Sequence, residues 1–157
     1  MLDQILARAS VHAHRGLVNN TRMLIEEAYQ EAGRCGADIH HRANELLGIA
    51  YHTGYASSIE LAKRYAYGGI THPALDHLAI ALDYAHHAGI DAGHDAHFVR
   101  THAYGTLIRE ALFEARRYVR RDPALAQEHL RRAEEYASIS GINLVDEHGR
   151  IVAMIPD

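Results

Sequence analysis

Histidine is the side chain through which this sequence offers most chemistry. The chain has 14 histidines among 157 residues, and they are spread along its length. Three of them, His86, His94 and His97, flank a short glycine-containing turn, with Asp91 and Asp95 beside it. If all three face inward from two consecutive helices, their rings would converge at one end of a helical hairpin. Three imidazoles and a carboxylate suit zinc, iron or copper.

A second pair of candidate ligands is His41 and Glu45, which are four residues apart and would share one face of a helix. Such pairs ligate metals in helical bundles, and they also form ordinary exposed ion pairs. The sequence therefore leaves two interpretations of its histidines open. They bind a transition metal, iron or zinc, or they hydrogen-bond to backbone carbonyls and tyrosine hydroxyls without binding anything.

Part of this pattern is similar to the ligand order of hemerythrin-like proteins, which are helical bundles that hold two irons. Their ligands run as a His, a His-x3-Glu pair, a His-x3-His pair and a His-x4-Asp pair. This chain has His12, then His41 with Glu45, and later His86 with Asp91. The resemblance implies a di-iron carrier or oxidase. The His-x3-His pair has no counterpart here, so we do not assign the chain to that family.

Composition and charge argue against several classes of function. A net charge of -4 disfavours a general binder of nucleic acids or anionic membranes. Several arginines between 116 and 132 stand three or four residues after a glutamate, as Arg117 does after Glu114 and Arg131 after Glu128, which is typical of an ion-paired exposed helix. No apolar run approaches the roughly 20 residues of a membrane span. The lone Cys35 and the absence of a secretory leader predict a cytoplasmic protein. No phosphate-binding loop or nucleophile elbow is present, so no catalytic residue is assigned.

The elements that must position these residues are helices. Apolar residues recur every three or four positions through most of the chain, and glycines and prolines mark the helix ends. We expect an all-α bundle of five or six helices. The pattern predicts an N-terminal helix over 2–32 (one long helix or two collinear ones hinged near 16–21), then helices over 39–53 or on to 67, 73–88, 94–120 and 123–140.

Two segments of the chain resemble each other. The Pro-Ala-Leu sequence at 73–75 recurs at 123–125, and Gly-Ile-Asp at 89–91 matches Gly-Ile-Asn at 141–143. We therefore expect a single domain that contains two copies of one helical hairpin. It divides into an N-terminal helix (1–36), the first copy (39–91), the second copy (92–143) and a tail (144–157).

The tail is expected to be a short β-hairpin or an extended segment, because its apolar run from Ile151 to Ile155 differs from the helical pattern. Such a run needs a docking surface, on its own helices or on another subunit. The sequence thus favours a non-catalytic interaction or assembly module, which forms a homo-oligomer or binds a protein partner. The alternative is a histidine-rich, iron- or zinc-binding helical bundle.

Overall fold

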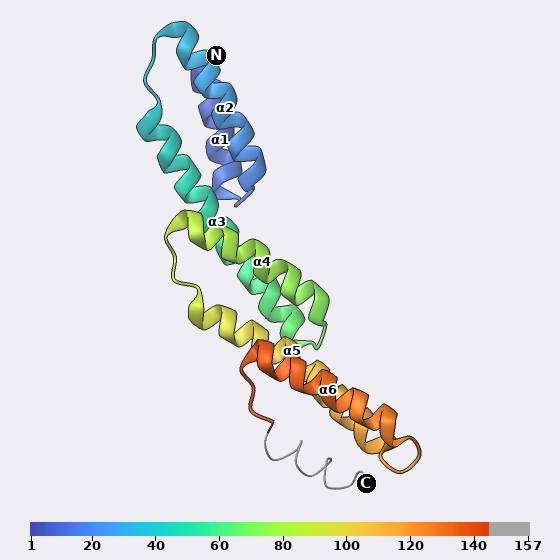
Figure 1. The fold of residues 1–157 in the computed structure, drawn as a ribbon. Helices are drawn as coiled ribbons and strands as arrows, with labels where there is room; N and C mark the ends of the chain where they lie inside the picture. Colours follow the sequence, from blue (N-terminus) through green and yellow to red (C-terminus); the bar gives the residue numbers. More distant parts are fainter. Residues whose placement is uncertain (145–157) are drawn as a thin grey trace. The chain divides into compact units, whose positions relative to one another are not determined.

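The computed structural model describes residues 1–144, which are helical almost throughout (Figure 1). No strand occurs in that part of the chain, so the all-α bundle is confirmed. The predicted tail lies outside the described residues except for Leu144. No helix within 1–144 is long and apolar enough to cross a membrane. The helices are α1 (Leu2–His14), α2 (Val18–Cys35), α3 (His40–Tyr67), α4 (Thr71–Ala88), α5 (Gly93–Tyr118) and α6 (Pro123–Ser140).

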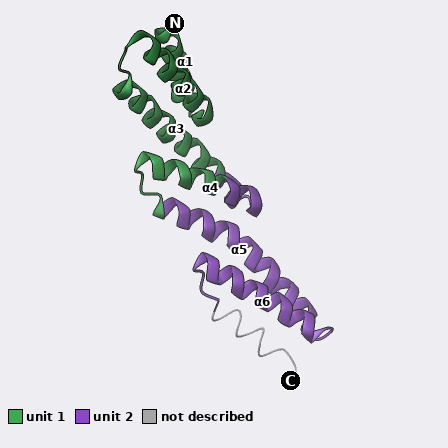
Figure 2. Ribbon diagram, turned by 45° about the horizontal axis from the view of Figure 1, so that its top comes forward, with its two compact units in different colours: residues 1–61, 77–93 green, residues 62–76, 94–157 purple. Residues whose placement is uncertain are grey.

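The chain divides into two compact units (Figure 2). The first contains residues 1–61 and 77–93, and the second contains 62–76 and 94–157. Two of the divisions fall inside helices, so α3 and α4 each contribute to both units. The predicted internal boundaries at 36, 91 and 143 are not those of the two units, and the single domain built from them stays a prediction.

The N-terminal segment forms two helices that lie side by side, and the predicted collinear arrangement over 2–32 is wrong (Figure 1). The chain reverses at Gly16, whose φ of +70° is a left-handed conformation that favours glycine. The reversal places the apolar stripe of α1, including Ile5 and Ala9, in one core with Ile25 and Ala28 of α2. Collinear helices would have left those two stripes apart.

The α1–α2 turn rests directly on the backbone of α3. A methyl group added at Gly16 would lie 2.8 Å from the backbone nitrogen of Gly54, closer than real contacts allow. Gly54 is constrained in the same way, because a methyl group there would lie 3.0 Å from both the Tyr84 ring and a Val18 methyl. Two glycines therefore let the turn, α3 and α4 meet within the first unit.

Alanine dominates the interior of the described chain. More than half of the buried apolar residues are alanines, and the largest side chains that are fully buried are Leu46, Val99 and Thr21. Small side chains allow helix axes to approach closely, because interaxial distance depends on the residues at the contact. The stability of the fold therefore depends on helix backbones packing at short range, with larger residues beside the alanines.

The buried positions follow one register through the three hairpins α1–α2, α3–α4 and α5–α6. In the first helix of each hairpin the spacing from one copy to the next is 53 residues throughout, as between the buried Ala9, Ala62 and Ala115. In the second helix it is 53 residues and then 52, as between the left-handed glycines Gly36, Gly89 and Gly141. The same register relates two further triplets of buried residues, which are Ile25, Leu78 and Leu130, and Ala28, Ala81 and Ala133. The sequence comparison found the second and third copies and missed the first.

The register also corrects the alignment of the two recognised copies. In the structure Ala74 corresponds to Ala126, since both are fully buried on their helices. The Pro-Ala-Leu match aligns Ala74 with Ala124 instead, and Ala124 is exposed. The Pro-Ala-Leu match therefore arises because both segments lie at the beginning of a helix, where proline is tolerated in the first turn. It does not show that the matched residues pack in the same way.

Replacing Gly16 by Ala will destabilise the protein more than replacing Gly36 by Ala. Both glycines have left-handed φ values, +70° and +74°, so both substitutions cost about 1 kcal/mol for the backbone. Only at Gly16 would the new methyl group collide with α3, because no atom lies within 4 Å of the corresponding position at Gly36. Urea denaturation of both variants measures the difference. Equal losses would show that the α1–α2 turn does not press on α3.

An Ala81→Leu substitution will lower the free energy of unfolding by about 1–3 kcal/mol, because overfilling a packed core forces side chains and backbone to move. Ala81 is fully buried on α4. The matched control is Ala79→Leu on the exposed side of the same helix, which should change stability by less than about 0.5 kcal/mol. Chemical denaturation of both variants tests whether the alanine contact is as tight as described.

Candidate functional site

The three histidines expected to point inward are exposed. His86 lies on α4 in the first unit, whereas His94 and His97 lie near the start of α5 in the second unit. The predicted inward orientation of all three is therefore wrong. The buried stripes are Ala74, Leu78, Ala81 and Ala85 on α4 and Ala96, Val99 and Ala103 on the first half of α5, so the buried face is displaced from the one that an inward orientation of these histidines requires.

The displacement has a packing cause. An inward His86 requires an α4 stripe centred on the leucines, but Leu75 and Leu82 are only half-buried, while the neighbouring Ala74 and Ala81 are fully buried. Where helices approach closely, the line of contact accepts alanine and the larger side chains fill the space beside it. A stripe placed one residue away rotates by about 100°, and this moves His86 from the interior to the surface.

The carboxylates proposed as partners for these histidines have other roles. An oxygen of Asp91 accepts a hydrogen bond from the backbone N–H of Gly93 at 3.0 Å. Asp95 pairs with Lys63 at 2.6 Å.

The second predicted pair is also open to solvent. His41 and Glu45 are both exposed near the start of α3, and the Glu45 carboxylate lies 3.1 Å from the Arg42 guanidinium. Within residues 1–144, no group of three or more histidine, cysteine or acidic side chains is placed to hold a metal ion. Metal binding by His41, Glu45, His86, His94 and His97 stays a prediction.

Several histidines instead make local contacts at the surface. The Nδ1 atoms of His14, His87 and His102 lie 2.8–2.9 Å from backbone carbonyls four residues earlier, so Nδ1 carries the proton that is donated. His40 shares a hydrogen bond of 3.2 Å with the Tyr29 hydroxyl. These are the partners of the second interpretation. None of the histidines within residues 1–144 is buried.

Aromatic stacking orders three of these rings. His87 lies flat on Tyr51, with ring centroids 4.6 Å apart and an interplanar angle of 9°. His102 stacks on Phe98 at 4.1 Å, and His129 on Tyr118 at 6.1 Å. Each contact holds an imidazole in one orientation at the edge of a helix pair. The arrangement favours individual surface roles for the histidines over a shared centre.

A pocket of about 230 Å³ lies at the α1–α2 turn, lined by residues 16–20 and Tyr84. The Tyr84 ring meets Tyr51 edge-on, with centroids 5.9 Å apart. Burial raises the pKa of the Tyr84 hydroxyl above its ordinary value, and Asp83 and Tyr51 raise it further. A phenol and two asparagine amides can donate and accept hydrogen bonds, but the lining contains no base or activated nucleophile.

The tyrosine pair is a feature of the repeat. Tyr104 and Tyr136 in the second unit have ring centroids 6.0 Å apart, and they follow Tyr51 and Tyr84 by 53 and 52 residues. The sequence analysis did not identify either tyrosine pair. The signal was present in the sequence as equal spacing, yet it identifies a pair only when two helices are known to be neighbours.

Comparisons with protein-family models, with curated proteins and with solved structures find no match to this chain.

Because folding raises the pKa of Tyr84, the protein should lose stability as pH rises above about 10, where the unfolded chain ionises this tyrosine and the folded chain does not. Below that pH the contribution is fully present. Tyr84→Phe removes it, so the variant's stability should fall less steeply in alkali. Urea midpoints from neutral to alkaline pH measure the slopes, with exposed Tyr67→Phe as control. Identical slopes for wild type and Tyr84→Phe would contradict the assignment.

Proposed function

We propose that this protein is a non-catalytic helical module that self-associates through the outer surfaces of its hairpins. The observation that supports the proposal is the division of side chains between the inside and the outside of the repeat. Alanines line the buried stripes, while many large apolar side chains project outward. The exposed large residues on the helices and turns are Val11, Leu17, Met23, Tyr29, Leu61, Tyr67, Ile70, Ile80, Phe113 and Ile139.

These apolar side chains are unfavourably exposed to water when the chain is alone. Covering them with a partner lowers the free energy, and repeated helical hairpins present extended surfaces suited to protein contacts. The dispersed histidines fit the same proposal, because exposed imidazoles, tyrosines and arginines are contact residues as well as ligands. No feature of residues 1–144 favours the second candidate, an iron or zinc site, and we do not propose it.

Sedimentation velocity of the untagged protein tests self-association. The expected result is a weight-average mass that rises above the 17.5 kDa of the chain as the concentration increases from low micromolar to several hundred micromolar. The rise should follow mass action and reverse on dilution. A mass that stays at one chain over the whole range, with circular dichroism showing a folded helical protein, would overturn the proposal.

A further inference from the structure

The α1–α2 hairpin presents two outward stripes that no part of the first unit covers. On α1 the exposed stripe is Gln4, Arg8 and Val11, continued by Arg15 directly after the helix, and on α2 it is Asn19, Met23, Glu26 and Gln30. Spacings of three and four residues place the members of each stripe on one helix face. Each stripe has an apolar residue at or near its centre, with Val11 52% exposed and Met23 69% exposed.

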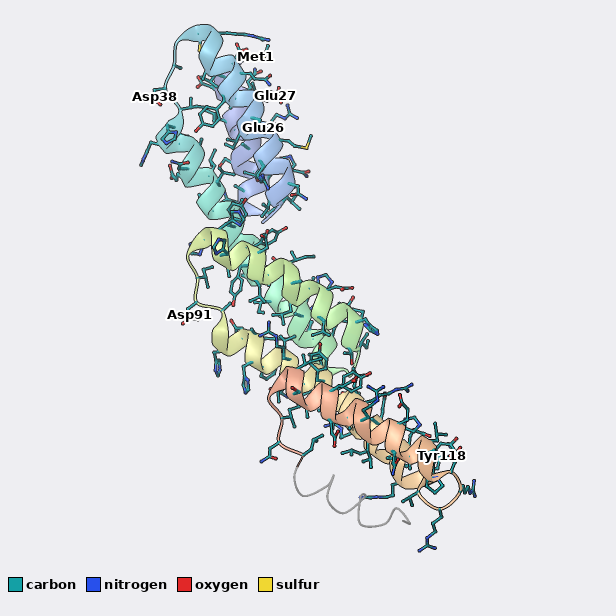
Figure 3. All side chains as sticks on the ribbon, viewed as in Figure 1. Met1, Glu26, Glu27, Asp38, Asp91 and Tyr118 are labelled. Atoms are coloured by element: carbon teal, nitrogen blue, oxygen red, sulfur yellow. The ribbon has the colours of Figure 1, made fainter. Side chains whose placement is uncertain are left out.

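The two stripes carry opposite charge. The α1 stripe contains Arg8 and Arg15 and no acidic residue, whereas the α2 stripe contains Glu26 and no basic residue, with Arg22 on one flank and Glu27 on the other. The side chains of Glu26 and Glu27 project outward from α2 (Figure 3). Arg8, Arg15, Glu26 and Glu27 form no ion pair within the described residues 1–144.

We propose that the α1–α2 hairpin is a self-complementary dimer surface, on which the α1 stripe of one copy packs against the α2 stripe of a second copy. In a two-fold interface the same surface of both copies is buried, so the charges and apolar residues of one part of that surface must complement those of another part. Here Arg8 and Arg15 face the glutamates of the second copy, and Val11 covers its methionine. The inference rests on the proposed self-association and names the surface that mediates it.

Charge complementarity decides the occupant of this surface. A second copy brings acidic residues to the arginines and arginines to the glutamates in one arrangement, whereas an acidic or a basic partner would satisfy one stripe and repel the other. Exposed ion pairs are weak one by one and are screened by salt. Self-association through this surface therefore weakens as the salt concentration rises.

A pair of charge reversals tests the surface. One variant is Arg8→Glu with Arg15→Glu, and the other is Glu26→Arg with Glu27→Arg. Each variant alone places like charges opposite each other, so its dissociation constant should rise about tenfold or more. An equal mixture of the two variants restores opposite charges and should associate as the wild type does. Sedimentation velocity at low and high salt provides the readout.

The matched control is Arg120→Glu with Arg121→Glu, which makes the same change in net charge at two exposed arginines of the α5–α6 turn. It should leave the dissociation constant within about twofold of wild type. Circular dichroism and thermal melting establish that each variant is folded, and the salt dependence of the wild type gives a second measurement that needs no variant.

The possible failures are distinguishable. If the wild type associates but both reversed variants associate equally well, or if mixing them restores nothing, the surface assignment is overturned and self-association stands. Insensitivity of the wild-type dimer to salt overturns the assignment as well. If the wild type stays a single chain at every concentration and salt level, the proposed function fails together with the inference.

Discussion

Close contact between helix backbones is the constraint on which the structure depends. Alanines occupy the lines of closest approach in every hairpin, and at the α1–α2 turn even alanine is too large, so Gly16 meets Gly54 directly. In a core of this kind the burial of any one side chain contributes little to stability. The stability comes instead from many short-range contacts, each of which is lost if a larger residue is inserted.

This constraint determines where polar chemistry can lie. An imidazole does not fit where two helices are separated only by alanine side chains, and the histidines of residues 1–144 are all exposed or half-buried. Some of them stack on tyrosine or phenylalanine and donate to carbonyls of their own helix, as His87 and His102 do. Within residues 1–144 the histidine-rich composition is therefore mainly a property of the surface.

The repeat relates the buried positions of the three hairpins to one another. Positions 53 or 52 residues apart share burial and, for the tyrosine pairs, share contacts. The exposed positions do not follow the register in their chemistry. At the surface position shared by three copies stand Val11, Arg64 and Arg117, so each hairpin offers a different outer face. That variation allows one hairpin to specialise as an interaction surface while the interior stays uniform.

Helical periodicity, glycine ends and the absence of long apolar runs determined the all-α class, because those signals are local. The sequence also showed that α5 and α6 are similar to α3 and α4. Three features needed the tertiary structure: the reversal at Gly16, the first copy of the repeat, and which face of α4 and of the first half of α5 is buried. In the sequence, a glycine that reverses the chain cannot be told from one that only bends a helix. Leucine is more hydrophobic than alanine, so a pattern based on hydrophobicity follows the leucines, although alanine occupies the closest helix contacts. Which residues become neighbours, and so which could share a site, is decided only when helices pack.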